Sequence, residues 1–317
     1  MTSKILILGA GGQIGSELTH ILRSRNGIDN VVASDINKKN LELVNSGPFE
    51  IIDATDFQAI KDCVIKYNVD TIFLMAAMLS AMGEKYPEKA WDLNMTSLFN
   101  VLNLAKEKCI KRLFWPSSIA VFGPTTPRDN TPQNTIMEPT TVYGITKQVG
   151  ERWCAYYYKN YGVDVRSIRY PGIISWKTLP GGGTTDYAVD IYHKAIAHKS
   201  YECFLDENTE LPMMFMDDAI RATIDIMNAD KDSIHVRSSY NITGISFTPK
   251  QIAESIKKHI PEFSISYKPD FRQKIADTWP KSIDDTEARA DWQWDHRYEL
   301  EDITQEMLTQ LRKKVVS

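Results

Sequence analysis

Cysteine and histidine are scarce in this chain of 317 residues, which has four cysteines and six histidines. No two cysteines form a C-x-x-C pair, and no two histidines stand at the H-x-x-x-H spacing, so the sequence gives no sign of a metal site. Scattered cysteines of this kind are typical of reduced thiols in a cytosolic protein. We therefore predict a cytoplasmic protein with no bound metal.

The chain also lacks an excess of basic residues and a long apolar run. Its net charge is −4 and its isoelectric point is about 5.9, so it presents no basic field to nucleic acid or anionic lipid. No segment approaches the roughly 20 apolar residues that span a membrane. With 43% hydrophobic and 25% charged residues, we expect a soluble globular chain of one or two domains, with neither nucleic acid nor membrane as a partner.

An apolar strand, a glycine-rich turn and a helical pattern follow one another at the amino terminus. Residues 4–8 are the apolar run, and glycines then stand at positions 9, 12 and 15. Such glycines allow a tight turn and keep side chains away from a pyrophosphate, which binds at the helix amino end. The spacing is three and three, which departs from G-x-G-x-x-G. We predict a dinucleotide site here.

The next apolar segment, residues 30–34, leads into Asp35, which lies 20 residues after Gly15. A carboxylate at this distance accepts hydrogen bonds from ribose hydroxyls and repels a 2′-phosphate, so it favours NAD over NADP. Lys38 and Lys39 argue the other way, because they would pair with a 2′-phosphate; alternatively they are solvated charges on the next helix. We predict NAD.

Ser118, Tyr143 and Lys147 together supply the parts that take a proton from an alcohol. Tyr143 and Lys147 stand at i and i+4, so on a helix they share one face and the ammonium favours the phenolate. Such a pair alone is common on helix surfaces. Residues 111–118, however, read as a buried strand that ends in Ser118, and open α/β sheets bind ligands at the carboxyl ends of strands. We predict Tyr143 as a general base beside Ser118.

Strands and helices alternate over the first 170 residues, which predicts an α/β fold with a doubly wound parallel (Rossmann) sheet. The expected strands are 49–53, 71–76, 111–118 and 163–170, and the expected helices are 57–67, 88–109 and 143–161. From residue 171 the alternation weakens, which indicates a second, smaller α/β substrate lobe. We predict an NAD-binding domain of residues 1–170 plus about 212–243, and a substrate-binding lobe of residues 171–211 plus 244–317.

Taken together, these motifs resemble the extended short-chain dehydrogenase/reductase superfamily over almost the whole chain. The matching pieces are Gly9-x-x-Gly12-x-x-Gly15, Asp35, Asp53-Ala54, Leu74-Met-Ala-Ala77, Asn94, Pro116-Ser-Ser118, Tyr143-x-x-x-Lys147 and Arg169-Tyr-Pro-Gly172. Within the superfamily, the chain is most similar to the zinc-independent L-threonine 3-dehydrogenases. That likeness rests on Met78-Leu-Ser80, on residues 115–123 and 180–188, and on Trp279-Pro280.

The resemblance implies an enzyme that oxidises the 3-hydroxyl of L-threonine to 2-amino-3-oxobutyrate and releases NADH. It implies Ser118, Tyr143 and Lys147 as catalytic residues, and a homodimer paired through the helices near 88–109 and 142–161. The residues implied to contact NAD are Gly9, Gly12, Gln13, Ile14, Gly15, Asp35, Asp53, Ala54, Leu74, Ala76, Ala77, Asn94, Tyr143, Lys147 and Tyr170.

A zwitterionic amino acid requires a cation for its carboxylate and an acceptor for its ammonium. Arg128 is a candidate for the carboxylate; its alternative interpretation is a plain surface arginine. Asp186 is a candidate for the ammonium, or else a cap for the helix that follows it. We expect Ser80, Thr184 and Thr185 to hold polar groups of the substrate, together with Ser118 and Tyr143.

Two other functions fit the same fold. A nucleotide-sugar epimerase or dehydratase keeps its NAD bound, but its nucleotide diphosphate requires several basic residues, and residues 180–188 offer glycines, hydroxyls and one acid. A redox-sensing binding protein without turnover usually lacks part of the catalytic set, and Ser118, Tyr143 and Lys147 are all present here.

Overall fold

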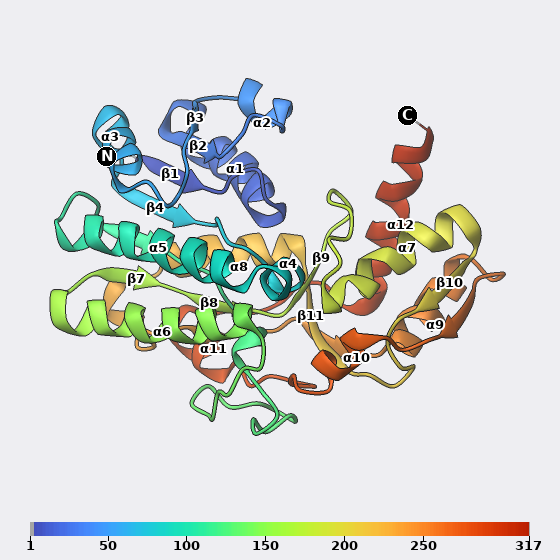
Figure 1. Cartoon of the computed structure of the whole chain (residues 1–317). Coiled ribbons are helices and arrows are strands. Elements are labelled where there is room, and N and C mark those ends of the chain that lie inside the picture. Colours follow the sequence, from blue (N-terminus) through green and yellow to red (C-terminus); the bar gives the residue numbers. More distant parts are fainter. Residues whose placement is uncertain (1–2, 317) are drawn as a thin grey trace. The chain divides into compact units, whose positions relative to one another are not determined.

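The computed structural model describes residues 3–316, which divide into two compact units (Figure 1). Unit 1 comprises the residues up to 118 together with 140–169 and 223–240, and unit 2 comprises 119–139, 170–222 and the residues from 241 onward. Residues 119–139 and 212–222, which the sequence-based division assigned to the first domain, thus pack with unit 2. That the two units bind cofactor and substrate stays a prediction.

A six-stranded sheet forms the centre of unit 1, in the order β3-β2-β1-β4-β5-β7. All its neighbouring strands are parallel, which confirms the predicted doubly wound sheet. The strands are β1 (Ile5–Leu8), β2 (Val31–Asp35), β3 (Phe49–Ile51), β4 (Thr71–Leu74), β5 (Arg112–Phe114) and β7 (Asp164–Arg166). The chain reverses its direction of travel across the sheet between β1 and β4. In such folds, ligands bind in the crevice outside the carboxyl ends of the strands at this point.

Helices cover the sheet, and their ends follow local sequence signals. The unit 1 helices are α1 (Gln13–Asn26), α2 (Leu41–Asn45), α3 (Phe57–Tyr67), α4 (Ser80–Lys85), α5 (Pro87–Lys106) and α6 (Val142–Tyr161). The Asp56 side chain caps α3 by accepting from Ala59 N, and α3 ends at Asn68, which has φ of 52°. The helices α5 and α6 lie alongside each other (Figure 1).

The strands of the large sheet are buried on both faces, as parallel strands are. All four residues of β1 and of β4 are buried. Leu6 and Leu8 of β1 and Ile72 and Leu74 of β4 belong to a hydrophobic core that also contains Leu98 of α5 and other residues of α3, α5 and α6. This core holds α6, and with it Tyr143 and Lys147, rigidly against the sheet.

Two of the predicted strands were wrong in that each is split in two. The segment 111–118 forms β5 and a separate β6 (Ser117–Ser118), because Pro116 between them has no amide hydrogen to continue the ladder. The segment 163–170 forms β7 and β8 (Ile168–Tyr170), because the chain changes partners at Ser167, whose carbonyl accepts from Tyr240 N. The strands β6, β8 and β12 (Tyr240–Asn241) make a sheet of their own.

Unit 2 contains two small sheets and several helices. One sheet has the order β13-β11-β9 and the other pairs β10 with β14. The strands are β9 (Gly172–Ile174), β10 (Ser200–Cys203), β11 (Leu211–Phe215), β13 (Ile245–Phe247) and β14 (Ser264–Tyr267). The helices are α7 (Tyr187–His198), α9 (Pro249–His259), α10 (Phe271–Ala276), α11 (Thr286–Trp292) and α12 (Leu300–Val316), while α8 (Met216–Asn228) continues into unit 1.

Candidate active site

The turn between β1 and α1 is shaped by two glycines that no other residue can replace without strain. Gly9 has φ of +84°, and a Cβ there would lie 2.5 Å from Ala76 N. A Cβ on Gly15 would lie 2.4 Å from Gly9 O. No side chain caps α1 at Gly12. Its first turn begins with Gln13 and Ile14 and contains no acidic residue. Backbone N–H groups are thus left for an anion, and the turn fits the pyrophosphate of a dinucleotide.

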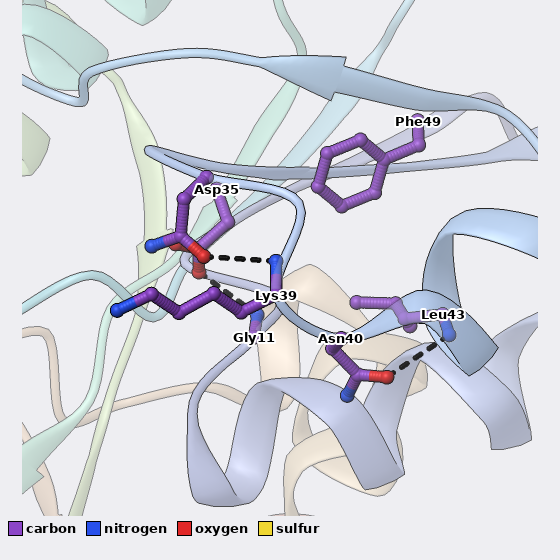
Figure 2. A pocket seen from close by; sticks show the side chains of 7 residues that line it. Gly11, Asp35, Lys39, Asn40, Leu43 and Phe49 are labelled. Atoms are coloured by element: carbon purple, nitrogen blue, oxygen red, sulfur yellow. Dashed lines mark hydrogen bonds between the residues drawn. The ribbon is translucent and has the colours of Figure 1, made fainter.

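A cavity of about 350 Å³ opens beside this turn, where β2 ends in Asp35 (Figure 2). The Asp35 carboxylate accepts hydrogen bonds from Gly11 N at 2.9 Å and from Ile36 N at 2.8 Å. These bonds fix the carboxylate beside the glycine turn, as a ribose-binding acid requires. The side chain of Lys39 also lines the cavity, so one of the two lysines that argue for a 2′-phosphate does lie here (Figure 2).

The other residues predicted to contact the cofactor lie mostly at the carboxyl edge of the sheet. Asp53 and Ala54 follow β3, and the Asp53 side chain is occupied locally by accepting from Thr55 N at 2.8 Å. Leu74 ends β4, with Ala76 and Ala77 directly after it. Tyr170 is the last residue of β8 and is buried. In the described part of unit 1, Asp53, Ala54, Leu74, Ala76 and Ala77 thus lie at the carboxyl ends of two strands of the sheet, β3 and β4. Tyr170 instead belongs to unit 2.

Asn94 of α5 is buried and joins two segments of unit 1 by hydrogen bonds. Its Oδ1 accepts from Met78 N at 2.8 Å and its Nδ2 donates to Met78 O at 3.2 Å. The same Nδ2 donates to Thr146 Oγ1 of α6 at 3.1 Å. Asn94 therefore ties the segment after β4 to the helix that bears Tyr143.

A second tie joins α4 to the start of α6. The Glu84 carboxylate accepts from Val142 N at 2.7 Å, where it faces the positive end of the helix dipole, and the Thr141 side chain accepts from Gly144 N at 3.1 Å. Ser80, predicted to contact substrate, is the first residue of α4. The segment carrying Ser80 is thus fastened one residue away from Tyr143.

Tyr143 and Ser118 meet in unit 1. The Tyr143 hydroxyl is hydrogen-bonded to the Ser118 side chain. Burial raises the pKa of Tyr143 to about 12, and the bond to Ser118 opposes that rise. The phenol therefore holds its proton in the protein alone, and ionisation of Tyr143 near neutral pH requires additional positive charge beside it.

Lys147 lies one turn along the same helix face and is 3% exposed. Its Nζ donates to Pro116 O at 2.6 Å and lies 4.5 Å from the centre of the Trp115 ring and 5.6 Å from that of Tyr143. Burial lowers the pKa of Lys147 to about 7. The ammonium is thus placed beside the phenol but is itself poised to lose its proton near neutral pH.

Sequence reasoning missed a buried network next to these residues. Glu151 of α6 accepts from Ser117 Oγ at 2.6 Å, and it forms a two-bond ion pair with Arg169, at 2.9 Å from Nε and 2.8 Å from the terminal nitrogen. Ser117 and Glu151 are each 1% exposed and Arg169 is 2% exposed. A signal was present in the sequence, because Glu151 continues the i, i+4 series of Tyr143 and Lys147.

The remaining substrate candidates lie in unit 2. Arg128 donates from Nε to Trp279 O at 2.9 Å, so one edge of its guanidinium is used within the unit. Asp186 accepts through one oxygen from Gly181 N at 2.7 Å and Gly183 N at 2.8 Å, which holds the glycine-rich loop closed before α7. Thr184 is buried, and Thr185 packs against Gly172. Asp186 occupies the N-cap position of α7, but its side chain makes no capping hydrogen bond to that helix, so the capping alternative was wrong. The substrate roles of these residues stay predictions.

Within the described residues there is no group of three or more His, Cys, Asp or Glu side chains that could hold a metal ion. Likewise, none of the helices described is both long enough and apolar enough to cross a membrane.

Comparison with known proteins gives the same family from sequence and from structure. The model of the NAD-dependent epimerase/dehydratase family matches residues 5–243. An uncharacterised epimerase/dehydratase of Staphylococcus aureus is 47% identical over 98% of this chain and 97% of its own length. The holo form of a GalE-like L-threonine dehydrogenase from Cupriavidus necator is 55% identical, with a TM-score of 0.94 over 97% of this chain and 99% of that one. The L-threonine dehydrogenase of Clostridium difficile is 47% identical, with a TM-score of 0.97 over 100% and 99%.

Proposed function

The chain belongs to the NAD-dependent epimerase/dehydratase family, and from that membership we propose that it oxidises L-threonine at its 3-hydroxyl to 2-amino-3-oxobutyrate and releases NADH. The observation that carries the proposal is the hydrogen bond of Ser118 to Tyr143, with Lys147 one turn along the same helix face. Solved relatives at 47% and 55% identity that bear the name L-threonine dehydrogenase support threonine as the substrate.

In the proposed reaction, Tyr143 Oη accepts the proton of the threonine hydroxyl as the oxygen forms its second bond to carbon 3. Ser118 holds that oxygen by a hydrogen bond, and Lys147 stabilises the Tyr143 phenolate by its charge. The hydrogen of carbon 3 leaves with its electron pair as hydride to the nicotinamide, which is the chemistry that NAD supplies when bound.

We propose that the substrate carboxylate binds the free edge of the Arg128 guanidinium. Asp186 would accept from the substrate ammonium through the oxygen that does not hold the glycine-rich loop. Ser80, Thr184 and Thr185 are further proposed contacts of the substrate's polar groups. Arg128→Ala and Asp186→Ala should each raise the KM for threonine while the affinity for NADH stays unchanged. An unaltered KM would remove the residue from the site.

We also propose a homodimer that forms through α5 and α6. These helices carry large side chains that are exposed in the single chain: Trp91 at 43%, Ile145 at 40% and Tyr156 at 46%. Exposed apolar surface of this size on neighbouring helices fits a partner copy. Analytical ultracentrifugation should give a dimer that Tyr156→Glu weakens; a monomer at micromolar concentration would contradict the proposal.

We propose further that the reaction uses no zinc and takes place in the cytoplasm. The four cysteines are all free, the state that a reducing compartment maintains. Activity that survives a chelator would support zinc independence.

The deciding experiment is the appearance of NADH absorbance when the purified protein is mixed with NAD and L-threonine. Parallel reactions would contain NADP, UDP-galactose or a metal chelator. We expect threonine-dependent NADH, no response to chelator, and loss of turnover in Tyr143→Phe with NADH binding preserved. Conversion of the nucleotide sugar and silence with threonine would transfer the assignment to a nucleotide-sugar epimerase or dehydratase.

A further inference from the structure

We propose that Glu151 is a positioning residue for the reaction: it fixes Ser117, and so the direction of Ser118, and it supplies the opposite charge that favours a protonated Lys147. The inference rests on the proposed function, because it assigns Ser118, Tyr143 and Lys147 their catalytic roles.

The first part of the argument is geometric. β6 consists of only two residues, so few backbone hydrogen bonds can fix its register. Ser117 Oγ donates to Glu151 at 2.6 Å, while its neighbour Ser118 bonds to Tyr143. Both partners belong to α6, so two adjacent serines are attached to one helix at points eight residues apart. Loss of the Ser117–Glu151 bond detaches from α6 the residue directly before Ser118.

The second part concerns the Glu151 carboxylate itself, which is held from the other side by Arg169. The two parallel hydrogen bonds fix both carboxylate oxygens, and a pair of this geometry is specific in direction. All three residues are at most 2% exposed, so water does not compete for the bonds. A buried charge pair is weak evidence for stability, because desolvation offsets its attraction. Its orientation toward Ser117 is therefore the more informative property.

The third part concerns charge. Glu151 lies at i+4 from Lys147, and within the described network the charged or titratable groups around that ammonium are Tyr143, Glu151 and Cys154 of α6, with Arg169 of β8 behind Glu151. Burial raises the pKa of the Cys154 thiol, so that group is neutral when Lys147 titrates. The Tyr143 phenol is neutral as well. Glu151 is thus the anion that opposes the effect of burial on Lys147.

The test compares matched variants. Ser117→Ala removes the hydroxyl bonded to Glu151, and Ser167→Ala removes a comparably buried hydroxyl of unit 1, which is bonded to Ser239 at 2.9 Å. We expect Ser117→Ala to lower kcat for threonine by about tenfold with the KM for NAD unchanged, since about 1.4 kcal/mol of transition-state positioning corresponds to that factor. Ser167→Ala should keep the kcat of the wild type. Equal kcat in the two variants would overturn the geometric part.

Glu151→Gln tests the charge with a readout that does not depend on turnover. The Lys147 Cε resonance of the lysine-labelled protein, identified by its absence in Lys147→Met, reports the titration of the ammonium. We expect its midpoint to fall by roughly one to two pH units in Glu151→Gln. Asp164→Asn removes another buried, arginine-paired carboxylate of unit 1 and should leave the midpoint in place. An unmoved midpoint in Glu151→Gln overturns the charge part.

The two proposals fail separately. If the wild type does not oxidise threonine, the proposed function fails while the titration of Lys147 is still measured. If the wild type turns over and neither Ser117→Ala nor Glu151→Gln has its expected effect, the positioning role fails alone. Should Glu151→Gln not fold, Ser117→Ala against Ser167→Ala still decides whether the Glu151 bond to Ser117 positions Ser118.

Discussion

Replacement of Lys147 by methionine should abolish activity and yet stabilise the folded protein below neutral pH. Methionine keeps most of the apolar stem that packs in the buried site while it removes the ammonium. Burial lowers the pKa of Lys147 from its ordinary value of 10.5 to about 7, so the folded state disfavours the charged form. That difference of about 3.5 units corresponds to roughly 5 kcal/mol of destabilisation wherever both states are protonated.

The sign and the pH window follow from this lowered pKa. Below pH 7 the ammonium is charged in the folded and the unfolded protein, and the full cost is present. As the pH rises from about 7 to 10.5, the folded protein loses its proton first and the cost disappears. The substitution also removes the hydrogen bond from Lys147 to Pro116 O, and the carbonyl that is left unpaired costs about 1–3 kcal/mol at any pH. We therefore expect Lys147→Met to gain roughly 2–4 kcal/mol below pH 7 and to become less stable than the wild type above about pH 8.5–10.

Urea denaturation of the protein without NAD, followed by far-UV circular dichroism at pH 6, 8 and 10, measures this difference. Lys159→Met is the matched control, because Lys159 lies on the same helix with an exposed side chain and removal of a solvated ammonium should change little at any of the three values. A Lys147→Met protein that is less stable than the wild type at pH 6, or whose gain is the same at pH 10, would refute the reasoning.

Three further substitutions test other parts of unit 1. Gly150→Ala should lower the melting temperature, because the new Cβ would lie 2.4 Å from the ring of Trp115. We expect the overpacking, which costs about 1–3 kcal/mol, to outweigh a gain of about 1 kcal/mol in helix propensity. An unchanged melting temperature would contradict this. Asp35→Asn should reduce the preference for NAD over NADP in kcat/KM by about tenfold, because the charge that repels a 2′-phosphate is removed; an unaltered ratio would count against Asp35 as the discriminating residue. Glu84→Ala should cost about 0.5–1 kcal/mol at the start of α6 and speed amide exchange at Val142, whereas unchanged exchange would show that the Glu84 bond does not hold the helix.

The parallel sheet was predictable because its signals are local. Apolar strands alternate with helices, and the cap of α3 can be read from Asp56 and Asn68, so the predicted range 57–67 is the observed one. The division of 111–118 was readable in part from Pro116. The division at Ser167 was not, because it depends on Tyr240, which lies more than 70 residues later in the chain and bonds to the Ser167 carbonyl. Strand partners so distant in sequence leave no periodic signal.

The same distinction separates the predicted site residues from the missed ones. Tyr143, Lys147 and Ser118 stand out because their chemistry and spacing are specific. Glu151 shares their helix face, yet in sequence it looks like one more surface acid. Its burial becomes evident only when Arg169 of β8 and Ser117 of β6 are brought to it. Functional side chains that are held by other side chains are thus the part of a site that sequence reasoning misses most readily.

Desolvation sets the protonation states of Tyr143 and Lys147 in the protein without NAD. It raises the pKa of Tyr143 to about 12 and lowers that of Lys147 to about 7, so near neutral pH the phenol is protonated and the ammonium is only partly charged. A phenolate at pH 7 therefore requires about 5 pKa units, or roughly 7 kcal/mol, of added stabilisation. The bond from Ser118 is already included in the pKa of about 12. In the proposed mechanism, a fully charged Lys147 provides part of the added stabilisation, and the positive charge of oxidised nicotinamide is the remaining source. In that mechanism Tyr143 becomes competent as a base when NAD is bound, which confines proton abstraction to the complex that is ready to accept the hydride.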